Sequence, residues 1–260
     1  MKNILLTFDV EEFDLPREFG CNISEEEMYE ISKQGLSNII ILLKKYDLKA
    51  TFFTTANFAK KYPEILKKLY KEGYEIASHG YDHSFSNQSY NQIKRAKQEK
   101  EKIINGKIKG YRAPRFDMEH LKDLHYLGFI YDSSIHPTFI PGRYMNLFKK
   151  RKIHKVGKII EIPPSVLPLI RLPIFWLAFK NLPKFYARFF IKMNFFFSDY
   201  TMLVFHSWEF ANLEDIKIPR FIKRKHGKEM LRSLEDFIIF SKEEYSFNTI
   251  SNFLKEENYL

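Results

Sequence analysis

The chain alternates short apolar runs with longer amphipathic segments, and polar residues follow the apolar runs. Apolar runs of strand character cover residues 3–8, 49–56, 75–80, 109–114, 130–134 and 201–205. Residues 24–46, 62–74, 88–104 and 118–129 have the spacing of amphipathic helices. Strands that alternate with helices in this way predict parallel βαβ units, which gather functional residues at the carboxyl ends of their strands.

Five chemically versatile side chains stand at such strand ends. They are Asp9, His79, Arg112, Asp132 and His206. At 260 residues, with 26 Phe and 15 Tyr to fill a core, we expect one α/β domain over residues 1–260.

Cysteine content and the apolar stretches indicate the compartment in which the protein is expected. Cys21 is the only cysteine, which excludes an intramolecular disulfide, and the chain opens on a strand-like run where a signal peptide would stand, so we expect a cytoplasmic protein. The longest apolar stretch, residues 171–197, contains five Lys or Arg residues. Because a membrane-spanning helix needs about 20 mostly uncharged residues, this stretch is not predicted to be one.

His79 and His83 stand four residues apart in SHGYDHS, a spacing that lets both imidazoles face one divalent metal ion. Such pairs are also common on surfaces, so the pair alone leaves a structural role open. Residues 7–14, TFDVEEFD, supply carboxylates at a strand end and favour the metal site. Two histidines and one carboxylate, with positions left open, suit Zn, and also Co, Ni or Fe.

Five segments taken together resemble the polysaccharide deacetylase family, also called the NodB homology domain or carbohydrate esterase family 4. They are TFD, SHGYDHS, YRAPRF, YDSS and LVFHSWEF, in the family's order, and the resemblance covers about residues 1–240. It implies a distorted (β/α)7-type barrel that hydrolyses the N-acetyl group of an amino sugar with the help of a divalent metal, most often Zn.

The resemblance also implies roles for the residues at the strand ends. Asp9 looks like the general base, Arg112 like the residue that orients it, and His79 and His83 like metal ligands. His206 looks like the general acid and Asp132 like the carboxylate that tunes it. A structural salt bridge for Arg112 and a helix cap for Asp132 remain open.

The first motif departs from the family, because Val10 stands where a second aspartate is usual. Strand alternation returns Glu11 to the Asp9 side, so we expect Glu11 to be the third metal ligand. Glu12 is assigned to the rim of the site, and Asp14 to a loop or a substrate contact.

Substrate contacts are expected from the segments that follow the fourth and the last strand. The residues are Arg115, Phe116, Trp208 and Glu209, with a backbone N–H near Arg115 or Phe116 stabilising the oxyanion and Glu209 also able to orient His206.

The Asp-Val-Glu sequence resembles a branch of the family linked to exopolysaccharide and surface-glycan assembly. We therefore expect an N-acetylated glycan of a bacterial surface polysaccharide, or its lipid-linked precursor, as substrate. A deformylase, a hydrolase of small cyclic amides on the same fold, and a catalytically inert glycan-binding barrel remain alternatives, the last two because Val10 replaces the metal aspartate.

An irregular basic and aromatic insertion is expected around residues 137–200. Residues 133–198 hold twelve Lys or Arg and a single acid, Glu161, which accounts for the net charge of +10. Nucleic acid is not expected as a partner, since no nucleic-acid motif is present. Packing in the barrel and peripheral contact with the inner face of an anionic membrane are both open, the latter through Phe175, Trp176, Phe179, Phe185, Tyr186, Phe189 and Phe190.

Overall fold

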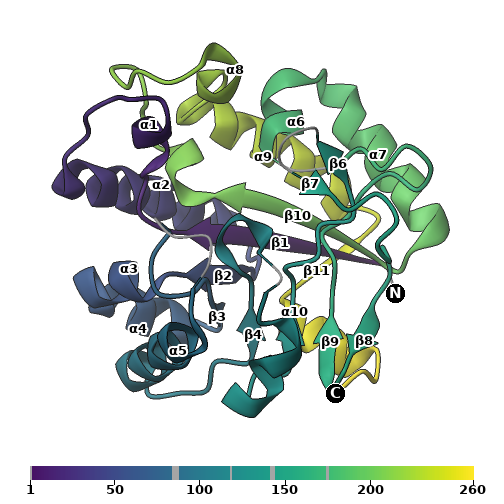
Figure 1. The fold of residues 1–260 in the computed structure, drawn as a ribbon. Coiled ribbons are helices and arrows are strands. Elements are labelled where there is room, and N and C mark those ends of the chain that lie inside the picture. Colours follow the sequence, from purple (N-terminus) through teal and green to yellow (C-terminus); the bar gives the residue numbers. More distant parts are fainter. Residues whose placement is uncertain (1, 84–87, 118, 141–143, 174–175) are drawn as a thin grey trace.

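The protein is described by a computed structural model that covers residues 2–83, 88–117, 119–140, 144–173 and 176–260. Its centre is a sheet in the order β10-β1-β2-β3-β4-β5-β9-β8, parallel except where β8 pairs with β9, and β11 pairs with the start of β1. Figure 1 shows β1 and β10 side by side through the middle of the molecule. The strands are β1 (Asn3–Val10), β2 (Thr51–Thr54), β3 (Glu75–Ser78), β4 (Gly110–Tyr111), β5 (Tyr131–Asp132), β8 (His154–Val156), β9 (Ile159–Glu161), β10 (Tyr200–His206) and β11 (Ser246–Asn248).

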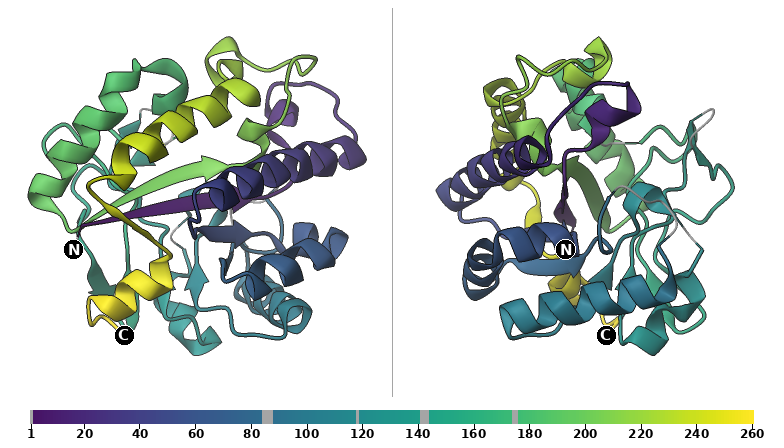
Figure 2. Two further views of the ribbon diagram at one scale, coloured as in Figure 1. Left: turned by 180° about the vertical axis from the view of Figure 1, so that it is seen from behind. Right: turned by 60° about the vertical axis from the view of Figure 1, so that its left-hand side comes forward.

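Helices cover the outside of the sheet, as the two views of Figure 2 show. They are α1 (Leu15–Glu18), α2 (Glu25–Lys45), α3 (Ala56–Lys61), α4 (Pro63–Lys71), α5 (Tyr90–Ile104), α6 (Trp176–Asn181), α7 (Lys184–Phe197), α8 (Arg220–Lys223), α9 (Lys228–Lys242) and α10 (Ile250–Glu256), with 3₁₀ turns η1 (Pro114–Phe116), η2 (Leu121–Leu127) and η3 (Ser207–Phe210). Ser24 caps α2 as its sequence predicts, accepting the Glu27 amide at 3.2 Å.

The sheet curls toward closure between β9 and β10. The Ser165 amide donates to the Met202 carbonyl at 3.3 Å, and the Met202 amide donates to Ser165 Oγ at 2.8 Å. The parallel strands β10, β1, β2, β3, β4, β5 and β9 thus form the predicted distorted seven-stranded barrel.

Alternation along β1 separates two cores. Leu5 belongs to an inner cluster with Phe53, Tyr131 and Met202, and α10 closes this cluster with Ile250. Ile4, Leu6, Phe8 and Val10 belong to the outer cluster under the helices. Because side chains alternate, Thr7, Asp9 and Glu11 follow the inward direction of Leu5 to the carboxyl end of the barrel.

The segment 118–129 differs from its predicted amphipathic helix, because it forms the 3₁₀ turn η2. It buries Leu121 and Leu124, which are three residues apart, and side chains at this spacing align in a 3₁₀ helix. Gly128 ends the turn with φ +74°, as its position suggests. Helix α3, by contrast, was not predicted.

The insertion at residues 137–200 is more regular than its seven prolines suggest. It contains the hairpin of β6 (Phe139–Ile140) and β7 (Tyr144–Met145), the pair β8 and β9, and helices α6 and α7. Of the aromatic residues for which barrel packing and membrane contact were both open, Trp176, Phe179 and Phe190 are buried in the core, whereas Phe185 and Phe189 are exposed. Phe175 lies outside the described residues. Among the helices of the described chain, none combines the length and hydropathy of a bilayer-spanning segment.

Candidate active site and metal centre

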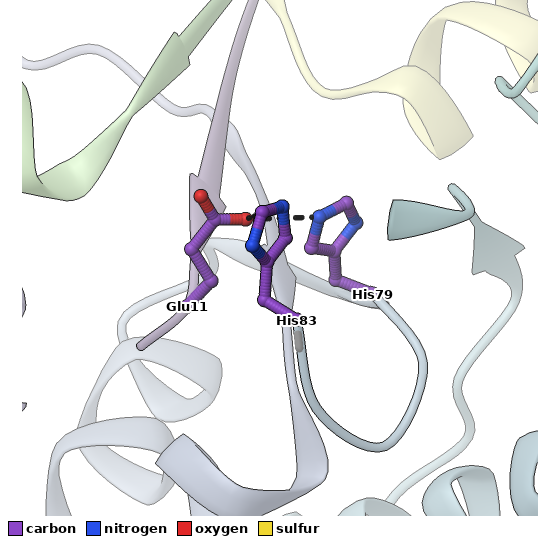
Figure 3. Close-up of side chains that lie close together, drawn as sticks. All are labelled: Glu11, His79 and His83. Carbon is purple, nitrogen blue, oxygen red and sulfur yellow. Dashed lines mark ion pairs between the residues drawn. The ribbon is translucent and has the colours of Figure 1, made fainter. Parts of the chain in front are cut away.

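Glu11, His79 and His83 meet at the carboxyl end of the barrel, where β1 and the loop after β3 come together (Figure 3). Oε2 of Glu11 lies 3.1 Å from Nε2 of His79 and 3.4 Å from Nε2 of His83. One ligand atom from each residue lies within 4.8 Å of the other two. The three residues predicted as ligands are therefore brought together.

Hydrogen bonds at Nδ1 orient both imidazoles. Nδ1 of His79 lies 2.9 Å from the backbone carbonyl of Arg112, and Nδ1 of His83 lies 2.8 Å from Oδ1 of Asp14. Carbonyl and carboxylate oxygens only accept, so each Nδ1 is the donor, and Nε2 of each ring is directed at the common point. This is the arrangement in which protein histidines hold a metal.

The donor set fits a divalent metal ion. Oε2 of Glu11 is buried, and the two imidazole nitrogens of His79 and His83 face it. Burial raises the pKa of Glu11, but the charges of His83 and His206 and the hydrogen bond with His79 outweigh it and hold that pKa well below its usual range. Burial lowers the pKa of His83, yet Glu11 and Asp14 raise it to about 9, so a metal bound at Nε2 takes the place of a proton.

Asp9 lies beside this cluster on β1 and is held by Arg112. Nη1 of Arg112 donates to Oδ1 of Asp9 at 2.8 Å and to Oγ1 of Thr7 at 3.0 Å. Arg112 is fully buried, and its other nitrogens reach Ser133, while the guanidinium lies 4.0 Å from the centre of the Phe53 ring. Arg112 thus orients the Asp9 carboxylate inside the barrel.

His206 enters from β10, where it is the register partner of Asp9. Its Nδ1 lies 3.0 Å from Oε1 of Glu209, and the same oxygen accepts the His206 amide at 2.6 Å. Burial lowers the pKa of His206, but Glu11 and Glu209 raise it above its usual value. Nδ1–H is directed to Glu209, and Nε2 lies 4.0 Å from Oε1 of Glu11.

The predicted partner of His206, Asp132, is placed elsewhere. The Asp132 carboxylate accepts the amide and hydroxyl of Ser134 at 2.8 and 2.7 Å and hydrogen-bonds to Glu161, its partner across β5 and β9. Asp132 and Glu161 are both fully buried below the site. These contacts with Ser134 form a local turn and not the helix cap left open for DSS, because the described residues 133–138 are not helical. Glu209 occupies the position expected for Asp132.

A cavity of about 290 Å³ opens above these groups. Arg115, Phe116 and Trp208 line it, as predicted for substrate contacts. Glu209 does not, since it is fully buried behind His206. The Phe116 amide already donates to the Ala113 carbonyl at 3.0 Å, which favours the amide of Arg115, in the left-handed region at φ +56°, as the oxyanion donor.

Helix α5 anchors the histidine loop through a buried cation. Nζ of Lys100 donates to the Thr54 carbonyl (2.7 Å), Ser78 Oγ (2.8 Å) and the Gly80 carbonyl (3.0 Å). All three ammonium donors are therefore used, at the ends of β2 and β3 and just after His79.

Two acids of the opening motif are placed differently from expectation. Glu12 is buried, not at the rim: the Tyr29 hydroxyl donates to its Oε1 at 3.3 Å, and burial raises its pKa to about 7. Asp14 orients His83, a role that sequence reasoning missed, because the two residues are 69 positions apart and only the folded loops bring them together.

The first half of the chain is similar in sequence to a known protein family. Residues 1–129 match the family model described as polysaccharide deacetylase. A peptidoglycan deacetylase of Helicobacter pylori is 29% identical over 190 residues, which is 65% of this chain and 62% of that protein. The chain spans 15–28% of the length of four other curated relatives.

Two solved structures superpose on nearly the whole chain. A polysaccharide deacetylase homologue from Mycobacterium smegmatis has a TM-score of 0.66 at 18% identity, over 98% of this chain and 89% of that one. The Puue allantoinase has a TM-score of 0.64 at 16% identity, over 96% and 88%. At these identities the structures establish the fold and leave the substrate open. Residues 1–129 are thus similar in sequence to the polysaccharide deacetylase family, and the described chain shares the fold of these solved structures.

Proposed function

We propose that the protein is a metal-dependent hydrolase that removes the N-acetyl group from an amino sugar of a glycan. The observation that carries this proposal is the convergence of Glu11, His79 and His83 beside two further ordered pairs, Asp9 with Arg112 and His206 with Glu209. Asp9, Glu11, His79, His83 and His206 all line one cavity. The set supplies a metal site, a base and an acid for amide hydrolysis.

Glu11, His79 and His83 would hold a divalent metal ion, which would supply Lewis acidity to the amide carbonyl and to the attacking water. Asp9, ion-paired with Arg112, takes a proton from that water as the new C–O bond forms. His206, with its raised pKa, gives a proton to the sugar nitrogen as the C–N bond breaks. The products are acetate and a free amine. The Arg115 amide is our candidate for the oxyanion donor.

The substrate that we propose is an N-acetylated glycan of a bacterial surface polysaccharide or its lipid-linked precursor. The support is the Asp-Val-Glu motif together with an aromatic cavity wall of Phe116, Tyr144, Trp176 and Trp208, which suits the apolar face of a sugar ring. Cytoplasmic action and the identity of the metal as Zn belong to the same proposal.

The test separates the reaction products. The protein is loaded with Zn, Co or Ni and incubated with N-acetylglucosamine oligomers, and acetate, formate and ammonia are measured separately. We expect acetate release that a chelator removes and added metal restores. His79→Ala and His206→Ala should abolish it, whereas His154→Ala, on β8 away from the cavity, should not.

Each other outcome identifies an alternative. Formate as the main product indicates a deformylase, and ammonia from a ureide indicates a cyclic amide hydrolase. Glycan binding with neither turnover nor bound metal would replace the proposal with an inert binding barrel.

A further inference from the structure

Six large apolar side chains are exposed on two loops between β6 and α6. Their exposed fractions are Phe148 95%, Leu169 90%, Met145 82%, Ile170 68%, Phe139 50% and Leu172 40%. Single exposed apolar residues are ordinary, but a set of this size on neighbouring loops marks an interaction surface. We call these six residues the apolar rim.

Hydrogen bonds hold the two loops together, so the rim is continuous. Thr138 Oγ1 donates to the Arg171 carbonyl at 2.8 Å, and Nη1 of Arg171 donates to the Lys149 carbonyl at 3.2 Å. Phe139 and Met145 are cross-strand partners in the hairpin of β6 and β7. Phe148 is next to Lys149, and Ile170 and Leu172 flank Arg171.

The exposed charges within residues 137–172 are positive, and of these Lys152 shares a surface pocket with Asp199 and Glu257. Glu161 is the only acid in residues 137–172, and it is fully buried. Lys149, Lys150 and Lys152 are exposed, and Arg151 and Arg171 are partly so. Apolar side chains beside cations, with no exposed acid between them, complement an anionic lipid surface.

The rim also adjoins the mouth of the active site. Ile140 and Tyr144 belong to the same hairpin as Phe139 and Met145 and line the catalytic cavity. Phe221, which is 56% exposed, lines the same cavity from α8. Because side chains alternate along β6 and β7, the hairpin would separate a bilayer on its Phe139 and Met145 face from the cavity on its Ile140 and Tyr144 face.

We propose that the apolar rim docks the protein on an anionic phospholipid bilayer, with Phe148, Leu169 and Met145 entering the interface and Lys149 and Lys150 contacting lipid phosphates. The docking does not depend on the reaction. The further consequence, that the site acts on glycans carried by a membrane lipid, rests on the proposed function.

The experiment is cosedimentation of the full chain with vesicles of phosphatidylglycerol and phosphatidylcholine in equal amounts, in 0.1 M salt. His79→Ala is measured alongside, so that binding is scored independently of turnover. We expect binding of both proteins and at least tenfold weaker binding to pure phosphatidylcholine. Phe148→Ser/Leu169→Ser should bind at least tenfold more weakly. Lys149→Glu/Lys150→Glu should weaken vesicle binding about fivefold for each positive charge lost, equivalent to about 1 kcal/mol.

The matched control is Phe185→Ser/Phe189→Ser on the outer face of α7, where the two side chains are 70% and 53% exposed. It should bind vesicles as the unchanged protein does, and circular dichroism should show every variant folded. Equal binding of the rim variants and the unchanged protein would overturn the proposal, as would loss of binding only in the α7 variant. Failure of the unchanged protein to bind, with a dimer in light scattering that the rim variants abolish, would reassign the rim to self-association.

Acetate release from a short soluble oligosaccharide separates the two proposals. The rim variants should retain it, because none of the changed residues lines the cavity. Vesicle binding without acetate release would leave the docking intact and contradict the proposed function, and the reverse result would contradict only the docking.

Discussion

Nδ1 of His206 lies 3.0 Å from Oε1 of Glu209, three residues further along the chain. Glu209 is fully buried, and its Oε2 lies 3.9 Å from the buried ammonium of Lys180. The histidine at the end of β10 is therefore oriented by its own following turn.

Replacing Glu209 tests this orientation. Glu209→Gln keeps an oxygen for the His206 amide but removes the charge that favours the imidazolium, so we expect kcat for acetate release to fall about tenfold to a hundredfold. The acid requirement in the pH–rate profile should shift to lower pH, because the His206 pKa falls. Asp132→Asn should leave the acid requirement of the pH–rate profile at the same pH. A shift in the Asp132 variant alone would return the tuning role to Asp132.

The hydrogen bond from His83 to Asp14 should contribute to metal affinity. Asp14→Ala removes the acceptor that orients the ring, so we expect affinity for Zn to fall about tenfold to a hundredfold in competition with a chromophoric chelator. Asp14→Asn retains an oxygen in the same place and should lose less. Equal affinity in both variants and the unchanged protein would show that the ring is oriented without Asp14.

Glu11 and Glu12 are adjacent buried acids whose side chains contact different residues. Glu11→Gln keeps the oxygen that accepts from Nε1 of Trp208 at 3.3 Å but removes the charged ligand, so Zn affinity should fall at least about a hundredfold. Glu12→Gln, whose partner is Tyr29, should leave Zn affinity within a few fold. Metal analysis of the purified variants checks both, and a larger loss for Glu12→Gln would place the ligand at Glu12.

The buried pair of Glu161 and Asp132 predicts a pH dependence of stability. Burial and the neighbouring Asp132 raise the pKa of Glu161 well above its usual value. Below the unfolded-state pKa of about 4.3, Glu161 is protonated in both the folded and the unfolded state. The stability contributed by the protonated buried carboxyl is then fully present. As the pH rises toward the folded pKa, only the unfolded state loses the proton, and the free energy of unfolding falls.

Glu161→Gln should remove that decline, because the amide cannot ionise and can still accept the Ile135 amide. Urea unfolding at pH 5 and pH 8 measures the free energy of unfolding. The gain of the variant over the unchanged protein should be larger at pH 8, by about 1.4 kcal/mol for each pH unit over which only the folded state keeps the proton. The exposed Glu243→Gln is the control. A gain independent of pH would show that the pair is not protonated in the folded state.

Much of the fold and of the site is predictable from the sequence. The strand β1 and the helices α2, α4 and α5 follow from local periodicity, the barrel is what the family resemblance implies, and strand alternation places Glu11 on the side of Asp9. The contacts of Asp14 and Asp132 could not be predicted in the same way. They depend on which loop or strand passes behind a side chain, and no local pattern in the chain records that.

The three hydrogen bonds of Lys100 have a consequence for engineering. The segment SHGYDH carries two histidines of the proposed centre, yet its path is set by an ammonium from α5 and a carbonyl from β2. Transplanting the hexapeptide to another scaffold would carry over the donors without their geometry. A portable unit needs the stretch from β2 through α5, residues 51–104, the end of β1 as far as Asp14, and the Arg112 carbonyl that orients His79.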